Sequence, residues 1–389
     1  MPVPLVLHAP SLPKPSASAV LAKSAVVVDA ASGKVLWKRD PDTPRYPAST
    51  TKIMTVLLLL ERCSPDEIIK APSDIEKVKE ASMNLKPGEK ITAADMGYAM
   101  LLRSANDGCV ATAVHISGSV PAFAKLMNER AKEMGLTHTY FHNPNGLNDT
   151  LHKISAHDLA MVGREAMKRE DFREIARTYK RKITRSINKK DEVMVSKNKW
   201  LKKDPSADGI KTGYTKPAGL TYVGSVNRKG FRIIDSIMNT ENWQADHKAL
   251  LDWTYKTYEE TERYPASTIL GTASIEGGVQ NTVPYAASEF FHVLARRGQA
   301  RSIIEFHPKE GLTAPITKGQ ALGDVTVTDA EGFVQTLPVY ATEAIEPVRF
   351  VAAVGNTFDG RTVAVGGALF GGFLLMRRRT RKTYARFRI

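Results

Sequence analysis

The chain has 389 residues, enough for two domains and a further segment. Its composition, 42% hydrophobic and 25% charged, is that of an ordinary globular protein, and its two cysteines, Cys63 and Cys109, are too few for a disulfide framework or a structural zinc site. The net charge of +14 does not indicate a nucleic-acid-binding face, because half of it lies in residues 377–389 and the remainder, spread over the other residues, selects no partner.

Residues 1–22 are rich in Pro and Ser, and they predict a flexible lead-in or the remnant of an export signal. Ala17-Ser18-Ala19 resembles a signal cleavage site. The stretch before it has no early Lys or Arg, and prolines interrupt its apolar run, so the export signal is incomplete.

Residues 23–262 have the pattern of a folded domain. Ala25–Asp29 predicts a strand, a turn follows at 31–34, and Val35 begins the return strand. Residues 51–62 are apolar nearly all round at helical spacing, which predicts a helix buried inside the domain. Further helices are predicted at 92–118, 121–134, 156–167 and about 241–256, and further strands at about 191–196, 220–226 and 231–238. Strands at both ends with helices between them predict an α/β or α+β domain closed by a sheet.

The C-terminal part of the chain has a different texture. Residues 266–346 contain short alternating runs separated by glycines, which predicts a small β-rich domain. Residues 362–376 lack charge and would span about 22 Å as a helix, against ~30 Å for the hydrocarbon core. The arginines that follow favour a membrane anchor, with the basic tail 377–389 in the cytoplasm and the domains outside. An in-plane amphipathic segment or a docking helix are the alternatives.

Ser49 and Lys52 put a hydroxyl and an amine three residues apart in the apolar run that opens with PASTTKIMT. On a helix this spacing brings both side chains to one face, within reach of each other. A serine needs a base to become a nucleophile. A lysine can be that base when burial and a second cation disfavour its charged form. S-x-x-K alone occurs often by chance.

Two further motifs follow in order. Ser104-Ala105-Asn106 comes after an apolar run, and Lys211-Thr212-Gly213 opens what looks like a strand. S-x-x-K, an S-x-N element and K-T-G together are the signature of penicillin-binding proteins and related β-lactamases. This chemistry uses no metal and no organic cofactor, and the nine histidines show no metal-binding spacing, so neither is predicted.

The surrounding sequence closely resembles the serine-type D-alanyl-D-alanine carboxypeptidases, the low-molecular-mass penicillin-binding proteins. The resemblance covers about residues 24–260 and includes the stretches VVVDAASGKVLWKRDPDTPRYPASTTKIMT, FHNPNGLNDTLHKISAHDLA and DGIKTGYT. Residues 266–346, with APITKGQALGDVTV, resemble the β-rich C-terminal domain of the same family. The resemblance implies a transpeptidase/β-lactamase-like α/β (α+β) fold with a central antiparallel sheet and a buried helix, followed by a C-terminal membrane anchor.

The resemblance implies a catalytic role for three residues. Ser49 would attack the carbonyl of the penultimate D-Ala of a peptidoglycan stem peptide and become acylated. Lys52 would accept the serine proton, and Ser104 would pass a proton to the leaving D-Ala nitrogen. Water would then hydrolyse the acyl-enzyme, and β-lactam antibiotics would inhibit the enzyme at the same serine.

The resemblance also implies a substrate-binding group. Asn106 would hold the substrate amide, while Lys211 and Thr212 would bind the terminal carboxylate. Lys211 would also be the second cation that lowers the pKa of Lys52. Tyr214, which follows Gly213, would supply one backbone N–H of the oxyanion hole, and Ser49 would supply the other. Relatives often have His at position 214, so contacts made by the Tyr214 side chain would differ.

Other functions with the same motifs stay open. A β-lactamase needs a deacylating glutamate between the second and third motifs, and the candidates there, Glu165, Glu170 and Glu174, have a helix-like context. A D,D-endopeptidase would use the same three motifs. A non-catalytic penicillin-sensing or peptidoglycan-binding protein is the alternative from another class. The basic run at 199–203 either steers an anionic peptide or is a solvated loop.

Overall fold

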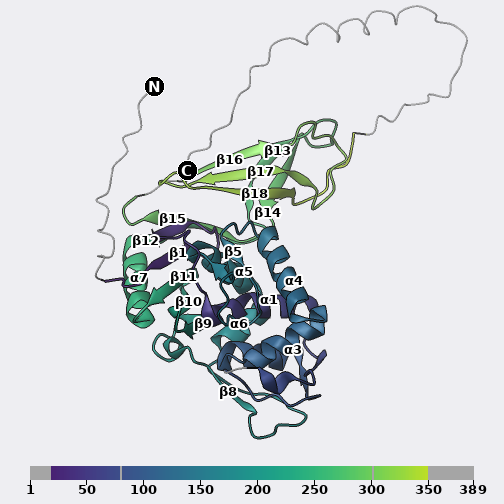
Figure 1. The fold of residues 1–389 in the computed structure, drawn as a ribbon. Coiled ribbons are helices and arrows are strands. Elements are labelled where there is room, and N and C mark those ends of the chain that lie inside the picture. The colour runs from purple at the N-terminus through teal and green to yellow at the C-terminus, as the bar shows by residue number, and fades with distance from the viewer. Residues whose placement is uncertain (1–18, 79–80, 300–301, 349–389) are drawn as a thin grey trace, which may run out of the picture. The chain divides into compact units, whose positions relative to one another are not determined.

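The computed structural model describes residues 19–78, 81–299 and 302–348 (Figure 1). The predicted membrane anchor at 362–376, the basic tail at 377–389 and most of the predicted lead-in lie outside the described residues. The described chain divides into two compact units. The first ends at Glu262 and takes in a short stretch from Leu294, and the second begins at Arg263 and resumes after that stretch.

The first unit is built on a five-stranded antiparallel sheet with the order β2-β1-β11-β10-β9. Its strands are β1 (Ser24–Asp29), β2 (Val35–Arg39), β9 (Ala207–Thr215), β10 (Gly219–Arg228) and β11 (Phe231–Thr240). The sheet predicted from the resemblance is therefore present. It joins β1 to β11, from opposite ends of the unit, so that the three motifs are brought together by one scaffold.

Both faces of this sheet are buried, because side chains alternate between two separate cores. Along β1, Val26 and Val28 belong to one core, while Ala25 and Val27 belong to the other. This period of two is what a strand with two covered faces requires. The β10–β11 hairpin turns through Lys229 and Gly230, both with positive φ, as a tight hairpin demands.

Helices cover the two faces unequally. The first core contains α1 (Lys52–Arg62), in which every residue from Lys52 to Leu59 is buried. Burying a leucine side chain stabilises a fold by roughly 1.5–3 kcal/mol, so this run fixes the helix inside the unit. The opposite face is covered by α7 (Trp243–Thr257). The other helices are α2 (Ala93–Tyr98), α3 (Asn106–Ser117), α4 (Val120–Glu133), α5 (Ala156–Lys168) and α6 (Glu170–Arg177), with short helices η1 (Ala48–Thr51), η2 (Ile75–Lys77), η3 (Ala99–Arg103) and η4 (Lys199–Lys202).

The long helix predicted at 92–118 is wrong in one respect, because it is interrupted. α2 runs into a π-helical turn, η3, and Ser104 then adopts a left-handed conformation with φ 69°. The chain re-enters helix at Asn106. A periodic apolar pattern does not report such a break, since the apolar side chains on both sides still face the same core. The break places the second motif at a bend between η3 and α3.

Small antiparallel pairs lie outside the central sheet. They are β3 (Ile68–Lys70) with β4 (Lys90–Thr92), β5 (Thr139–Tyr140) with β6 (Lys153–Ile154), and β7 (Lys180–Lys182) with β8 (Val193–Val195). The strand predicted at 191–196 is thus one arm of a hairpin rather than part of the main sheet.

The second unit is β-rich, as predicted. Its five-stranded antiparallel sheet has the order β13-β14-β18-β17-β16, around a core of its own that includes Val283, Leu322 and Val339. The strands of this sheet are β13 (Ile269–Ser274), β14 (Thr282–Ala287), β16 (Ile303–Pro308), β17 (Ala321–Thr328) and β18 (Val334–Ala341). β12 (Tyr258–Tyr264) and β15 (Phe291–Arg296), which both contain residues of the first unit, form a separate pair.

Among the described residues, no single helix is long and apolar enough to cross a membrane. The helices α3 and α4 pass that test by length and composition when taken together, but the break between them bends the pair by 82°.

Candidate active site

The first motif lies where η1 passes into α1. Ser49 is half-buried in η1, and Lys52 is the first residue of α1, with no solvent exposure. Lys52 Nζ lies 3.0 Å from Ser49 Oγ. Because every residue from Lys52 to Leu59 is buried, the Lys52 side chain is enclosed by the core and lies beside the serine.

Lys52 Nζ contacts two more acceptors. It donates to Asn106 Oδ1 at 2.7 Å and to the backbone carbonyl of Asn145 at 2.6 Å. The amine therefore joins the first motif, the second motif and a loop that no motif contains. With three directional contacts on one nitrogen, the position of Nζ is determined from three sides.

Burial lowers the pKa of Lys52 from 10.5 to about 8. Among the charged groups, Lys197 lowers this pKa further, while Cys109 and Asp107 raise it. A change of this size corresponds to roughly 3 kcal/mol of bias against the ammonium form. The site therefore holds an amine that can accept a proton near neutral pH.

The second motif is held at the bend between η3 and α3. Ser104 is 3% exposed, and the Asn106 backbone N–H donates to the Ala81 carbonyl at 2.7 Å. The next residue, Asp107, accepts hydrogen bonds from the Ser82 hydroxyl and from backbone N–H groups of residues 83 and 85. Asp107 thus ties the start of α3, and with it Asn106, to the loop at 81–85.

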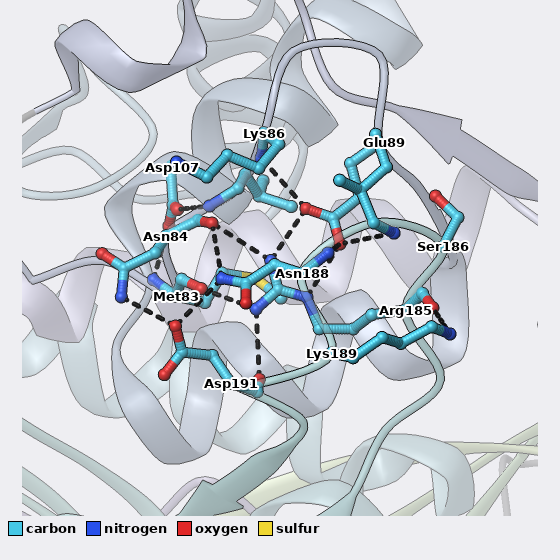
Figure 2. A network of polar contacts seen from close by, with 12 residues as sticks. Met83, Asn84, Lys86, Glu89, Asp107, Arg185, Ser186, Asn188, Lys189 and Asp191 are labelled. Atoms are coloured by element: carbon cyan, nitrogen blue, oxygen red, sulfur yellow. Dashed lines mark hydrogen bonds and ion pairs between the residues drawn. The ribbon is translucent and has the colours of Figure 1, made fainter.

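A buried ion pair supports that loop (Figure 2). Arg185 and Glu89 have no solvent exposure and lie 2.8 Å apart. Arg185 also donates to the carbonyls of Met83 and Asn84, at 2.7 and 3.2 Å. Figure 2 shows these residues and Asp107 in one continuous network, so the conformation of the second motif depends on contacts made from the β7–β8 connection.

The third motif lies on β9 at the edge of the sheet. Lys211 is 1% exposed, Thr212 is half-buried, and Tyr214 projects outward with 64% exposure. Gly213 pairs with Thr221 on β10, and a β-carbon on Gly213 would lie 2.3 Å from Thr221 Oγ1 and 3.0 Å from the Ser49 nitrogen. The absence of a side chain at Gly213 is what lets η1 rest against β9 at this point.

The electrostatics of Lys211 connect it with Lys52 and with Lys197. Burial lowers the pKa of Lys211 well below its usual value, and the charges of Lys52 and Lys197 lower it further. The charges of Lys52 and Lys211 interact, and the effect of Lys211 on the pKa of Lys52 stays a prediction; Lys197 is a further cation that lowers the pKa of Lys52.

The loop at 143–146 is a part of the site that none of the three motifs contains. Asn143 Oδ1 accepts from the backbone N–H groups of Asn145 and Gly146, which closes the turn. The Asn145 carbonyl then points at Lys52, and Gly146, with φ 84°, sits against the Ala48 carbonyl. A backbone carbonyl has no signature in a sequence, so only the Asn-Pro-Asn-Gly turn itself could have indicated this loop.

His152 fastens the same loop to the first motif. Its Nδ1 accepts from the His142 backbone N–H at 3.0 Å, which leaves Nε2–H to donate to Thr51 Oγ1 at 2.9 Å. The Thr51 hydroxyl in turn donates to the Ala48 carbonyl at 2.9 Å. Burial lowers the pKa of His152 to about 4, so the ring is neutral at physiological pH and can make both contacts.

One group of described side chains has the composition of a metal site, away from the residues above. Cys63, Glu67 and His115 bring their donor atoms within 4.8 Å of one another. His115 Nε2 already contacts Glu67 at 2.7 Å, and burial together with Glu67 raises the pKa of the Cys63 thiol to about 11. Glu67 and His115 therefore satisfy each other, and the Cys63 thiol is protonated at neutral pH.

Comparisons with known proteins agree with this geometry. The sequence model of the D-alanyl-D-alanine carboxypeptidase family matches residues 11–242, and that of the C-terminal domain of penicillin-binding protein 5 matches residues 258–347. D-alanyl-D-alanine carboxypeptidase DacF of Bacillus subtilis is 32% identical over 351 residues, which cover 88% of this chain and 90% of DacF. D-alanyl-D-alanine carboxypeptidase DacC of Escherichia coli is 28% identical over 355 residues, which cover 87% of this chain and 88% of DacC.

Solved structures lead to the same family. Penicillin-binding protein 5 from Haemophilus influenzae superimposes with a TM-score of 0.69 at 25% identity, covering 84% of this chain and 98% of that one. A D-alanyl-D-alanine carboxypeptidase from Mycobacterium tuberculosis superimposes with a TM-score of 0.59 at 28% identity, covering 64% and 94%. The resemblance found in the sequence is therefore confirmed. The chain belongs to the D-alanyl-D-alanine carboxypeptidase family, with a mixed α/β penicillin-binding fold followed by a β-rich C-terminal domain.

Proposed function

We propose that this chain is a serine D-alanyl-D-alanine carboxypeptidase that removes the terminal D-alanine from peptidoglycan stem pentapeptides through an acyl-enzyme on Ser49. One observation carries the assignment of the nucleophile. Lys52 is fully buried, its pKa is lowered to about 8, and its Nζ lies 3.0 Å from Ser49 Oγ. A base next to a hydroxyl is the arrangement that nucleophilic serine catalysis requires. Family membership supports the reaction class.

In the first step, Ser49 Oγ attacks the carbonyl carbon of the penultimate D-alanine while its proton passes to neutral Lys52. With a pKa of about 8, roughly a tenth of the amine is neutral at pH 7. The negative charge that develops on the carbonyl oxygen is stabilised by the backbone N–H groups of Ser49 and Tyr214. The close approach of Gly213 to the Ser49 nitrogen supports this pairing of donors.

In the second step, the bond to the terminal D-alanine breaks, and its nitrogen receives a proton that Lys52 supplies through the Ser104 hydroxyl. The free D-alanine leaves. A water molecule then attacks the ester on Ser49, gives its proton to Lys52, and the ester oxygen of Ser49 recovers a proton from Lys52. The stem shortened by one residue leaves as a free acid, and no group other than water is consumed.

The substrate is held by the remaining motif residues. Lys211 and Thr212 bind the terminal carboxylate, and Asn106 holds the amide of the stem. A carboxylate beside Lys211 favours its ammonium form, which offsets the effects of burial and of Lys52 that lower its pKa in the free site. Binding of the substrate carboxylate therefore restores the Lys211 ammonium, which is the group that binds this carboxylate.

The glutamates that a β-lactamase would need are engaged elsewhere. Glu165 pairs with Arg130 at 3.0 Å and with Lys168 at 2.8 Å, and Glu174 accepts from the Tyr98 hydroxyl. Glu170 forms an ion pair with Arg173. These contacts favour a slowly deacylating peptidase over a β-lactamase. A D,D-endopeptidase remains the second candidate, because it would use the same site on a cross-linked stem.

The proposed setting is the outer face of the bacterial cytoplasmic membrane. The substrate is peptidoglycan, β-lactam antibiotics acylate Ser49 as inhibitors, and residues 362–376 hold the enzyme at the membrane. The support is the sequence of those residues and the chemistry of the substrate. Deletion of residues 360–389 tests the anchor: the full chain is expected with the membrane fraction, and a shortened chain that stays there would contradict it.

The activity is tested with a peptide that ends in Lys-D-Ala-D-Ala and an assay for free D-alanine. The full chain should release D-alanine, Ser49→Ala should not, and the exposed Ser64→Ala should behave like the native enzyme. Undiminished release by Ser49→Ala would refute the proposal. Mass spectrometry after benzylpenicillin should find a persistent adduct on Ser49, whereas rapid turnover would indicate a β-lactamase. Cleavage of cross-linked dimers in preference to pentapeptides would indicate an endopeptidase.

A further inference from the structure

Residues 180–203, called here the basic segment, concentrate most of the positive charge that lies outside the C-terminal tail. They contain ten Lys or Arg and two acidic residues, a net charge of +8. Residues 377–389 carry +7 of the total of +14, so all other residues together carry a net charge of −1. The excess charge of the catalytic unit is therefore a local feature and not a mild bias spread along the chain.

The basic segment presents this charge to solvent. Every Lys and Arg in it is exposed except Arg185, which is buried against Glu89. Acidic partners are few: Glu192 lies 3.1 Å from Lys182 and 4.0 Å from Lys189, and these two lysines still have 74% and 62% exposure. Like charges held close together on a surface repel one another, so an arrangement of this kind gains free energy from an anionic partner.

The basic segment also lies beside the second and third motifs. The Lys197 backbone N–H donates to the carbonyl of Leu102, two residues before Ser104. Asn198 then donates to the Tyr222 hydroxyl, which donates to the Gly209 carbonyl, two residues before Lys211. The segment thus passes between the second and third motifs. The segment also acts on the site electrostatically, because the charge of Lys197 lowers the pKa of both Lys52 and Lys211.

We propose that, when one stem peptide is bound at Ser49, the basic segment binds the carboxylates of neighbouring stem peptides on the same strand. The enzyme would then act on polymeric peptidoglycan in preference to free peptides. This inference rests on the proposed function and deepens it by naming the substrate class. Each uncleaved stem ends in a free carboxylate, and a glycan strand repeats that charge along its length. A short free peptide has one terminal carboxylate, which Lys211 and Thr212 bind. No carboxylate of that peptide is then left to bind the basic segment.

The polymer is the partner that the position of the segment favours. A strand with one stem bound at Ser49 must continue past the surface around the second and third motifs, and Lys197 lies beside the second motif. Several weak contacts to one polymer add as an effective concentration, which raises affinity without any new catalytic group. Anionic lipid is a different partner, and the test below distinguishes it.

The test compares two substrates with two sets of variants in the full chain. The substrates are insoluble peptidoglycan sacculi rich in pentapeptide stems and a diacetylated Lys-D-Ala-D-Ala peptide. The variant K180E/K190E/K199E reverses three exposed lysines of the segment. The control K23E/K132E/K256E makes the same change of charge on exposed lysines at the start of β1 and on α4 and α7. D-alanine release is measured at low and at physiological salt, and binding to phosphatidylglycerol vesicles is measured separately.

The expected result is a loss of about tenfold or more in D-alanine release from sacculi at low salt, within the range of electrostatic steering. The same variant should process the short peptide within about twofold of the native rate, since one carboxylate gains little from the segment. The control triple variant should match the native enzyme on both substrates.

Equal losses in both triple variants, or native-like action of K180E/K190E/K199E on sacculi, would overturn the inference. Lost vesicle binding with native-like action on sacculi would assign the surface to lipid instead. Absence of D-alanine release by the native chain from either substrate would refute the proposed function itself.

Discussion

Gly146 and Ala48 meet backbone to backbone. A β-carbon built on Gly146 would lie 1.8 Å from the Ala48 carbonyl oxygen and 2.8 Å from Thr51 Oγ1. Both residues have positive φ, 84° for Gly146 and 50° for Ala48, so two unusual conformations face each other next to the nucleophile. The loop that supplies the Asn145 carbonyl to Lys52 can lie this close because position 146 has no side chain.

Gly146→Ala should therefore impair acylation severely. The added methyl group cannot fit without moving the loop or η1, so the Asn145 carbonyl leaves Lys52 and the Ser49–Lys52 contact is lost. We expect at least a hundredfold slower acylation by benzylpenicillin, measured by stopped-flow, and a loss of several kcal/mol in the free energy of unfolding. Gly118→Ala is the matched control. Gly118 has φ 76° and nothing within 4 Å, so only backbone strain of about 1 kcal/mol is expected, with native acylation. Equal effects of the two substitutions would contradict the steric account.

Acylation should depend on the charge of Lys52. Because neutral amine is the proton acceptor, the acylation rate should rise about tenfold per pH unit well below pH 8 and level off above it. Lys197→Met removes the exposed cation that lowers the pKa of Lys52, so the midpoint of this curve should move to higher pH. Lys199→Met, two residues farther on, is the control and should leave the midpoint unchanged. A midpoint that does not move in Lys197→Met would show that burial alone sets the pKa.

Stability in acid should depend on His152. With a folded-state pKa of about 4 against 6.5, the unfolded chain binds a proton that the folded chain excludes between these values. This contribution to stability is complete above pH 6.5 and is lost as pH falls toward 4, amounting to roughly 3 kcal/mol. His152→Gln should be less stable at pH 7, and its free energy of unfolding should fall less between pH 6.5 and 4. Urea unfolding at several pH values measures this, with the exposed His138→Gln as control. Parallel pH curves for native and His152→Gln proteins would refute it.

The Arg185–Glu89 pair should be costly to break from one side only. Arg185→Met leaves the Glu89 carboxylate buried without its cation, and such a change costs about 3–5 kcal/mol. The double variant Arg185→Met/Glu89→Gln removes both charges and should recover part of that loss. Guanidinium unfolding provides the measurement, and Arg181→Met, on the exposed face of β7, is the control. Since the pair supports the loop bound by Asp107, acylation should also slow in Arg185→Met. A double variant less stable than Arg185→Met would rule out this interpretation.

Much of the fold follows from local patterns in the chain. The β-branched run of β1 and the all-round apolar run of α1 each predict the observed element, because both are buried on every side. The three motifs also predict the site by their chemistry, and the structure brings Ser49, Lys52 and Asn106 into direct contact. Their catalytic roles remain the proposal made above.

Other parts of the site had no local signal. The left-handed Ser104 interrupts a helix whose apolar periodicity continues on both sides, so the pattern predicts one helix where there are three elements. The Asn145 contribution is a carbonyl, which every residue has. The effect of Lys197 on Lys52 depends on spatial proximity across 145 positions of sequence, which no local pattern reports.

The pairing of β1 with β11 also determines how much of the chain must be synthesised before the active site can form. Ser24 is opposite Met238 in that ladder, so the first strand has no partner in the sheet's centre until more than two hundred further residues have been made. Contacts between such distant residues require a large loop to close before they stabilise anything, which makes folding slow and cooperative. A growing chain that has passed Lys52, and even Asn106, still lacks β9, against which η1 packs. The nucleophile is therefore made early, and the surroundings that make it reactive are complete only when the last strands of the sheet have been made.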